Sequence, residues 1–200
     1  SSVADRLGGK EFEGQVALPT RFAAEALARA ELFQFLIGNT DFSLFAGVDN
    51  CCHNAKVIQL NTGGGQFVPV PYDFDLSGIV NAPYAVTNPS LDIDSVTDRL
   101  FRGTACPPEV LDATIRLFQS KREAILKLWG TTELLEERDR REAVAYLEEQ
   151  LDLGDGLVRE RVGHHEARMA FGAAQVHQAA FGEQDDALAV GEDDVVDLRL

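Results

Sequence analysis

The sequence lacks the apolar runs that mark membrane proteins. None of its hydrophobic stretches reaches the ~18 residues that a membrane-spanning helix needs. The first residues, Ser-Ser-Val-Ala-Asp-Arg, contain neither a basic region nor an apolar stretch, so they do not resemble a secretory signal peptide. We therefore expect no membrane contact and a cytoplasmic location.

Positive charge is also scarce. The 200 residues include 18 Lys and Arg against 33 Asp and Glu, which gives a formal net charge of -15 at pH 7. Proteins that bind nucleic acids non-specifically rely on Lys and Arg to neutralise backbone phosphates. This composition therefore argues against a nucleic-acid partner, and it is compatible with cations and small-molecule ligands.

Cysteine is too rare and too poorly spaced for a disulfide framework. The sequence has three cysteines, Cys51, Cys52 and Cys106, an odd number with one adjacent pair. This pattern favours a reducing compartment, in agreement with a cytoplasmic location.

The triplet 51–53, Cys-Cys-His, also makes a poor zinc site. It has no Cys-x2-Cys spacing, and Cys106 or the pair at 164–165 would have to approach from far along the chain. A catalytic pair of Cys51 and His53, which share one face of an extended segment, is a second alternative that we disfavour.

The segment from Thr20 to Ile37 predicts a helix. Its apolar residues recur at steps of three or four, and Gly38 follows as a natural stop. Thr20 is the expected N-terminal cap. The predicted buried face consists of Phe22, Ala26, Ala30, Phe33 and Ile37.

A β-hairpin is predicted downstream of this helix. Residues 56–60 and 66–70 have strand composition, and the Asn-Thr-Gly-Gly-Gly stretch at 61–65 is typical of a turn. Pro69 has no N–H to donate, so the second strand should be an edge strand or should turn Pro69 away from its partner.

The rest of the chain is expected to be helical or irregular. Residues 76–106 contain Gly78, Pro83 and Pro89 and predict an irregular segment. Pro107-Pro108 should open a helix that ends at Gly130, and a further helix should run from Thr131 to about Leu151. We accordingly divide the chain into an N-terminal extension (1–18), a main domain (19–152) and a disordered acidic tail (153–200).

Four polar residues stand where these elements end. Asp41 follows the first helix, Asn54 precedes the hairpin, and Asp73 and Asp75 follow it. Because the two strands of a hairpin are antiparallel, Asn54 and Asp73 should lie at the same end. An amide oxygen and a carboxylate are suitable ligands for Mg²⁺, and a further carboxylate can orient a hydroxyl nucleophile for phosphoryl transfer.

The same stretches resemble the catalytic half of protein-kinase-like folds, especially the atypical branch with the spore-coat CotH-type kinases and the HipA-like kinases. The matching residues are Asn39-Thr40-Asp41, His53-Asn54 and Pro71-Tyr72-Asp73-Phe74-Asp75, within roughly residues 20–130. The resemblance implies an α+β fold, a mostly helical kinase-like C-terminal lobe with a small β-hairpin. It also implies Mg²⁺ and ATP as cofactors and a hydroxyl of a protein or small molecule as acceptor.

In that resemblance each matching residue receives a role. Asp41 is the catalytic base or hydroxyl-orienting acid, Asn54 and Asp73 bind the metal and nucleotide, and Asp75 is a second candidate metal ligand. Arg99 and Arg102 are candidates for phosphate or substrate contacts, although we prefer to interpret them as ordinary surface residues.

The sequence departs from the kinase pattern at two points. Asn54 follows Asp41 after thirteen positions, against about five in kinases, so the intervening loop bulges outward or else Asp49 or Asn50 takes part. No Gly-rich loop or strand lysine precedes residue 20, so we expect the N-terminal lobe to be absent from this chain. A non-catalytic, pseudokinase-like interaction module is the alternative function.

Overall fold

The computed structural model describes residues 2–14, 19–44, 53–62, 64–103 and 106–151. The chain divides into two units, Ser1–Glu166 and Ala167–Leu200, and all of the described residues belong to the first. The predicted disordered tail at 153–200 lies outside the described residues, as do the cysteines at 51 and 52. No helix in the described ranges is both long and apolar enough to cross a membrane.

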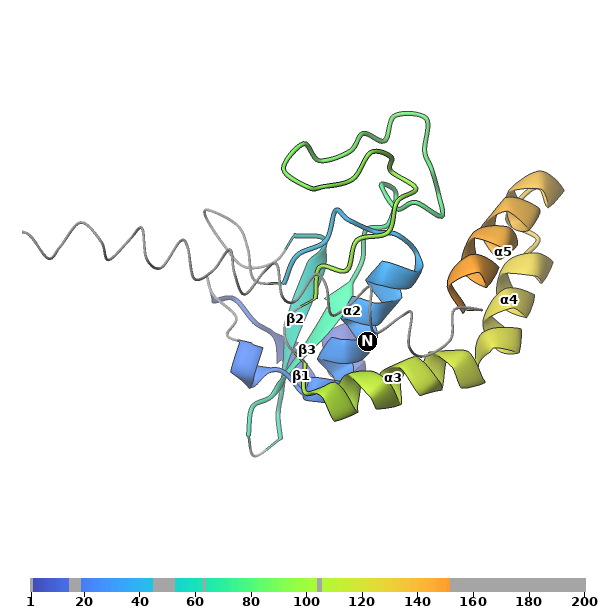
Figure 1. Cartoon of the computed structure of the whole chain (residues 1–200). Helices are drawn as coiled ribbons and strands as arrows, with labels where there is room; N and C mark the ends of the chain where they lie inside the picture. Colours follow the sequence, from blue (N-terminus) through green and yellow to red (C-terminus); the bar gives the residue numbers. More distant parts are fainter. Residues whose placement is uncertain (1, 15–18, 45–52, 63, 104–105, 152–200) are drawn as a thin grey trace, which may run out of the picture. The chain divides into compact units, whose positions relative to one another are not determined.

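The described part of the chain has an α+β fold, as expected. In chain order its elements are the helices and strands α1 (Val3–Arg6), β1 (Gly9–Glu11), a short 3₁₀ helix (Pro19–Arg21), α2 (Ala24–Leu36), β2 (Ala55–Leu60), β3 (Phe67–Pro71), α3 (Pro108–Ser120), α4 (Arg122–Thr131) and α5 (Glu137–Leu151) (Figure 1).

The predicted hairpin is confirmed and forms part of a larger sheet. Strands β2 and β3 are antiparallel, and Ala55 pairs with Pro71 and Val57 with Pro69. The strand order β1-β2-β3 places β3 at an edge, where the missing N–H of Pro69 is tolerated. The extra strand is β1, which pairs with β2 and comes from the segment that we expected to be an extension.

Helix α2 is a central helix and not an amphipathic surface helix. Its second half is buried almost all round, including the polar side chains of Glu31 and Gln34, whereas the predicted core residues Ala26 and Phe33 are only half-buried. One side of α2 packs on the sheet, and the other side packs on α3 and α5 (Figure 1). A helix in this position needs apolar residues on more than one face.

Two hydrophobic clusters stabilise this arrangement. The larger joins α2 to the sheet and to α3, and the smaller joins the last turn of α2 to α4 and α5. The buried members of the larger cluster are Phe22, Leu27, Ala28, Leu32, Phe35, Phe42, Leu44, Ala55, Val57, Phe67, Phe101, Cys106, Leu111 and Ile115. The buried members of the smaller cluster are Leu36, Leu126, Leu147 and Leu151.

Several predicted helix boundaries are wrong. Helix α2 begins after Ala23 without a side-chain cap, and Thr20 lies in the preceding 3₁₀ helix. The helix predicted to run from 107 to 130 is interrupted at Lys121, where α3 ends and α4 begins. The helix predicted from Thr131 starts at Glu137.

The segment between β3 and α3 has no helix or strand in its described residues, as its glycines and prolines predicted (Figure 1). It runs first along the end of α2, where the Gly78 N–H donates to the Gly38 carbonyl and the Ile79 N–H to the Ile37 carbonyl, each at 3.0 Å. The segment therefore fixes the C-terminal end of α2, from which Asp41 follows.

Candidate functional site

Helix α2 ends just before Gly38, and the chain continues from there into the candidate site. Gly38 has a φ of +66°, the left-handed conformation that glycine adopts most easily. The N–H groups of Gly38 and Asn39 donate to the carbonyls of Phe35 and Gln34, at 3.1 and 2.8 Å, which is the Schellman arrangement that ends many helices. The predicted end of this helix is thus confirmed, and the turn that carries Asp41 begins here.

Asn39 connects this turn to the end of the hairpin. Its side chain is buried, and its Oδ1 accepts a hydrogen bond from the Asp41 N–H at 3.0 Å. Its Nδ2 donates to the Asp73 carbonyl at 3.2 Å. One amide therefore positions Asp41 and also holds the backbone of Asp73 against the same turn.

Asp41 is contacted by His53 and Asn54, which follow it in the chain after a loop. The Asn54 Nδ2 donates to the Asp41 carbonyl and to its carboxylate Oδ2, each at 2.7 Å. The His53 Nε2 lies 3.0 Å from the Asp41 Oδ1. Because an ionised carboxylate only accepts hydrogen bonds, Nε2 is the protonated ring nitrogen when Asp41 is charged.

A short backbone pairing explains how residues thirteen positions apart come together. Ser43 and His53 form an isolated antiparallel bridge, with N···O distances of 3.2 and 2.8 Å between their backbones. This bridge closes the intervening loop at its base, so Asp41 and Asn54 meet despite the long spacing. The alternative participants Asp49 and Asn50 lie outside the described residues.

Asn54 adopts a conformation that few side chains tolerate. Its φ of +57° is in the left-handed region, where asparagine is enriched relative to other non-glycine residues. The Asn54 carbonyl accepts a hydrogen bond from the Tyr72 N–H at 3.2 Å. This contact extends the hairpin pairing by one step and places Asn54 beside the residue that precedes Asp73, as the antiparallel geometry predicted.

Asp73 and Asp75 lie in a turn that packs on helix α2. Asp73 Oδ1 accepts a long hydrogen bond of 3.4 Å from the Asp75 N–H. Between them, the Phe74 ring packs edge-to-face on Phe33 of α2, with 5.8 Å between ring centroids. The Tyr84 hydroxyl donates to Asp75 Oδ2 at 3.1 Å, and this bond raises the pKa of Tyr84. Asp75 is thus engaged by Tyr84.

Arg102 stabilises the turn that contains Asp41. Its guanidinium donates to the carbonyls of Thr40 and Phe42, at 2.5 and 3.0 Å. Burial lowers the pKa of Arg102, and the negative charge of Asp41 acts in the opposite direction. A half-buried arginine that binds the carbonyls of both neighbours of Asp41 fixes the backbone of this turn.

Arg99 is also a structural residue, so our interpretation of it as surface is wrong. Its side chain is 4% exposed and lies 3.6 Å above the centroid of the Tyr146 ring. It donates to the Leu36 carbonyl at 3.2 Å and to the Tyr146 carbonyl. Arg99 therefore ties the end of α2 to α5. The sequence contained no pattern that could have assigned these roles to Arg99 and Arg102.

The site remains open to solvent. The side chains of Asp41 and His53 are 33% and 59% exposed. Within the described ranges, no group of three or more His, Cys, Asp or Glu residues could hold a metal ion.

No protein-family model matches the chain, and neither a search of curated proteins nor a search of solved structures finds a significant match.

Proposed function

We propose that this chain carries the catalytic part of a magnesium-dependent phosphotransferase of the protein-kinase-like type. It would transfer the terminal phosphoryl group of ATP to a hydroxyl of a protein or a small molecule. The observation that carries the proposal is the contact of the Asn54 amide with both the carbonyl and the carboxylate of Asp41, at the end of the hairpin that bears Asp73.

The roles of the two asparagines follow from their hydrogen bonds. Since Asn54 uses its Nδ2 for Asp41, its Oδ1 has no partner among the described residues and is available to a cation. Asn39 keeps the turn of Asp41 and the backbone of Asp73 at a fixed separation. Such preorganisation is most of what a protein contributes to phosphoryl transfer.

Asp73 and Asp75 are the carboxylates that we propose as metal ligands. Asp73 makes one long hydrogen bond through its carboxylate within the described part of the chain, and in this proposal that carboxylate binds the cation together with the Oδ1 of Asn54. Mg²⁺, when bound, would neutralise charge on the phosphate oxygens. Asp75 is the weaker candidate ligand because the Tyr84 hydroxyl already occupies one of its oxygens.

Asp41 would act on the acceptor hydroxyl. Its carboxylate orients the O–H group and takes its proton as the hydroxyl oxygen bonds to the terminal phosphorus of ATP and the bond from that phosphorus to the leaving oxygen of ADP breaks. The hydrogen bonds from His53 and Asn54 orient the carboxylate of Asp41, and Arg102 binds the carbonyl of the preceding residue, Thr40.

The second candidate is a non-catalytic, pseudokinase-like module. The observation in its favour is that both carboxylate oxygens of Asp41 already accept hydrogen bonds from within the chain, one from His53 and one from Asn54. In this case the same contacts only stabilise the loop, and the chain binds a partner or a nucleotide without turnover.

Metal binding and turnover test the two candidates separately. We would measure Mn²⁺ binding by electron paramagnetic resonance, with and without ATP, and follow ADP formation with the same protein. We expect weak Mn²⁺ binding that ATP strengthens, because protein ligands alone are few. Asp73→Asn should abolish the ATP-dependent binding, whereas Asp94→Asn, which removes an exposed carboxylate elsewhere, should leave it unchanged.

The outcome for Asp41 separates catalysis from binding alone. A phosphotransferase should lose ADP formation in Asp41→Asn and keep ATP-dependent Mn²⁺ binding, since Asp41 is not placed as a metal ligand. Binding without ADP formation in the unmodified protein would support the non-catalytic module. If Mn²⁺ and ATP do not bind the unmodified protein at all, the phosphotransferase proposal is refuted.

A further inference from the structure

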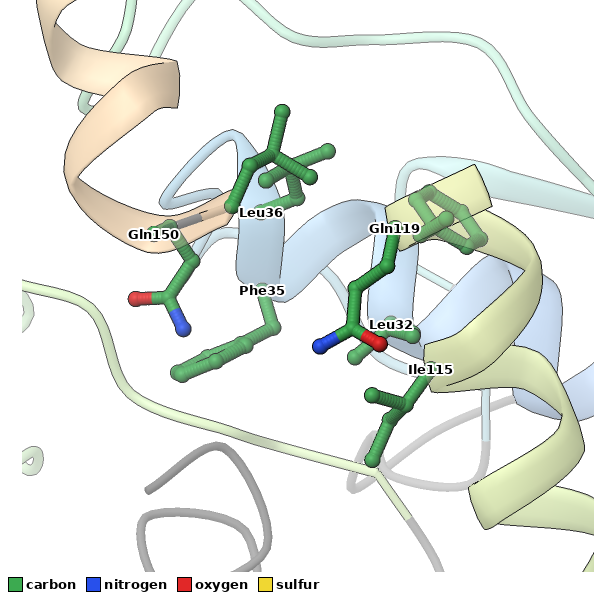
Figure 2. Close-up of a pocket in the computed structure, with 8 residues that line it drawn as sticks. Leu32, Phe35, Leu36, Ile115, Gln119 and Gln150 are labelled. Carbon is green, nitrogen blue, oxygen red and sulfur yellow. The ribbon is translucent and has the colours of Figure 1, made fainter. Parts of the chain in front are cut away.

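The internal space between α2, α3 and α5 is too small for a ligand larger than water. Phe35, Ile115 and Gln150 are among the side chains that converge on it (Figure 2). The space between them is about 30 Å³, which is room for a water molecule beside Gln150.

A much larger cleft lies between α5 and the irregular segment that follows β3. Its volume is about 580 Å³, within the range of sites that bind ligands. One wall consists mainly of residues 78–81, and the other consists of Arg138, Asp139, Glu142 and Tyr146 of α5.

The two walls of this cleft are joined by hydrogen bonds. The Tyr146 hydroxyl donates to the Thr97 carbonyl at 3.1 Å. The Arg99 guanidinium lies over the Tyr146 ring and donates to the Tyr146 carbonyl. The cleft is therefore part of the folded structure and does not need a ligand to form it.

The cleft adjoins the turn that carries Asp41. Two of its wall residues, Gly78 and Ile79, donate their N–H groups to the carbonyls of Gly38 and Ile37, each at 3.0 Å. A ligand in the cleft would therefore lie against the segment that leads into Asp41.

The charges in the cleft favour a cationic ligand. Among the described residues that line it, Arg138 is the only positively charged one, against the two acids Asp139 and Glu142. The Arg138 guanidinium donates to the Glu142 carboxylate at 2.7 Å. This bond, and the negative charge of Asp139, raise the pKa of Arg138. The cleft therefore has an excess of negative charge, as has the whole chain with its net charge of -15.

Exposed apolar side chains border the cleft. Val80, which lines it, is 49% exposed, and Tyr84 and Val86 in the same segment are 66% and 79% exposed. Large apolar side chains that gather on one exposed segment are typical of surfaces that bind another protein. They favour a polypeptide over a small amine as the occupant.

We propose that this cleft binds a segment of a partner protein in which a lysine or arginine stands between apolar residues. The basic side chain pairs with Asp139 and Glu142, and its apolar neighbours cover Val80 and Tyr84. One part of the proposal rests on the proposed function: in the phosphotransferase this partner is the acceptor, which makes the acceptor a protein with a basic segment.

Two ion pairs on α5 provide matched variants. Arg138 with Glu142 and Arg141 with Glu137 are both i,i+4 pairs with N···O distances of 2.7 Å, and all four side chains are exposed. The first pair lines the cleft, and the second is not among its described lining residues. Substitutions of such exposed pairs change stability little, so all four variants should fold.

The probe is a fluorescein-labelled peptide, Leu-Lys-Leu-Ser-Leu-Lys-Leu, titrated with the full chain and followed by fluorescence anisotropy. One counterpart has Gln in place of each Lys, and another has Ser in place of each Leu. The Lys peptide should bind saturably and about tenfold more tightly than the Gln counterpart, since two partly exposed ion pairs contribute about threefold each. The Ser counterpart should bind more weakly than the Lys peptide.

The variants should change the affinity for the Lys peptide in opposite directions. Glu142→Gln should weaken binding about threefold, and Arg138→Gln should strengthen it about threefold, because each changes the charge of the cleft by one unit. Glu137→Gln and Arg141→Gln make the same changes outside the cleft and should leave the affinity unchanged.

The proposal is overturned if the Lys peptide does not bind, or if Glu142→Gln and Glu137→Gln weaken its binding equally, which would mean non-specific attraction to an acidic surface. It is also overturned if the Ser counterpart binds as tightly, because the cleft would then accept any cation. The assay contains neither metal nor ATP. Its failure would leave the phosphotransferase with another acceptor, whereas failure of Mn²⁺ and ATP binding would leave this docking site to the non-catalytic module.

Discussion

Substitution of Asn54 tests the arrangement of the candidate site most directly. Asn54 combines a left-handed backbone with hydrogen bonds to the carbonyl and the carboxylate of Asp41. Asn54→Gly removes the side chain but accepts the backbone conformation, whereas Asn54→Ala removes the side chain and opposes the conformation. The pair of variants therefore separates the two contributions.

The expected losses follow from the geometry. A hydrogen bond to a charged group contributes ~1.5–3 kcal/mol to stability, and we take the lower value because Asp41 is 33% exposed. A left-handed alanine costs a further ~1–2 kcal/mol, and glycine costs ~0.4–1 kcal/mol through the entropy of the unfolded chain. We expect losses of ~2 kcal/mol for Asn54→Gly and ~3 kcal/mol for Asn54→Ala.

Equilibrium urea unfolding measures both losses. The chain has one tryptophan, and Trp129 packs against the cluster formed by α2, α4 and α5, so its fluorescence reports on the folded core. The slope of the free energy against urea should stay the same in all variants, because the same surface is exposed on unfolding. A changed slope would mean that the folded or unfolded state has itself changed.

A double-mutant cycle with Asp41→Ala provides the decisive result. If Asn54 acts through Asp41, the loss for Asn54→Gly should fall by ~1 kcal/mol or more in the Asp41→Ala background. Additive losses would show that the two side chains do not interact in solution. Equal stability of the Gly and Ala variants would refute the left-handed conformation at Asn54.

Three further predictions concern the supporting structure. Gly38→Ala should cost ~2–4 kcal/mol and lower the melting temperature, because its φ is +66° and the added Cβ would lie 2.0 Å from the Tyr146 hydroxyl. Leu147→Ala, at a position with 0% exposure, should cost ~2–5 kcal/mol by the same urea assay, whereas Leu134→Ala, at 94% exposure, should change stability by less than ~0.5 kcal/mol. Burial raises the pKa of Tyr146 to about 12. The neutral phenol therefore stabilises the folded state fully below pH ~10, the ordinary pKa of tyrosine, and this stabilisation is lost as the pH rises from there toward 12. Tyr146→Phe should flatten this decline in the free energy of unfolding measured against pH, and an unchanged decline would contradict the raised pKa of Tyr146.

Local patterns predicted the parts of the fold that depend on neighbouring residues. Gly38 ends its helix because glycine accepts a left-handed conformation without strain, and this property does not depend on the rest of the fold. The hairpin could be predicted because a glycine-rich turn separates two strand-forming segments. Pro69 indicated an edge strand through the chemistry of its own backbone.

The parts that depend on distant contacts could not be predicted. Strand β1 has the sequence Gly-Lys-Glu, which has no strand pattern, and it forms because β2 offers an unpaired edge. No proline or glycine stands beside Lys121 to mark the break between α3 and α4. Glu31 and Gln34 are buried because α2 is covered on several sides, whereas polar residues in a helix normally indicate a solvent-facing stripe.

The supporting residues of the site were missed for a related reason. Arg99 and Arg102 act on backbone carbonyls about sixty positions away in the chain, at Leu36, Thr40 and Phe42. An arginine that binds carbonyls has no complementary side chain that a sequence could reveal, and the acid that pairs with Arg99, Glu149 at 3.2 Å, lies fifty positions further along the chain. Such a role is visible only when the two segments are seen in contact.

The long spacing between Asp41 and Asn54 shows why spacing alone is a poor criterion for this kind of site. What the proposed chemistry needs is the amide beside the carboxylate, and the Ser43–His53 bridge provides this whatever lies between its ends. A loop closed at its base can change in length at little cost in free energy, because closure entropy grows only slowly with length. The arrangement that matters is therefore a set of contacts at the base of the loop, from Asp41 to His53 and Asn54, and a motif search with fixed gaps would pass over it.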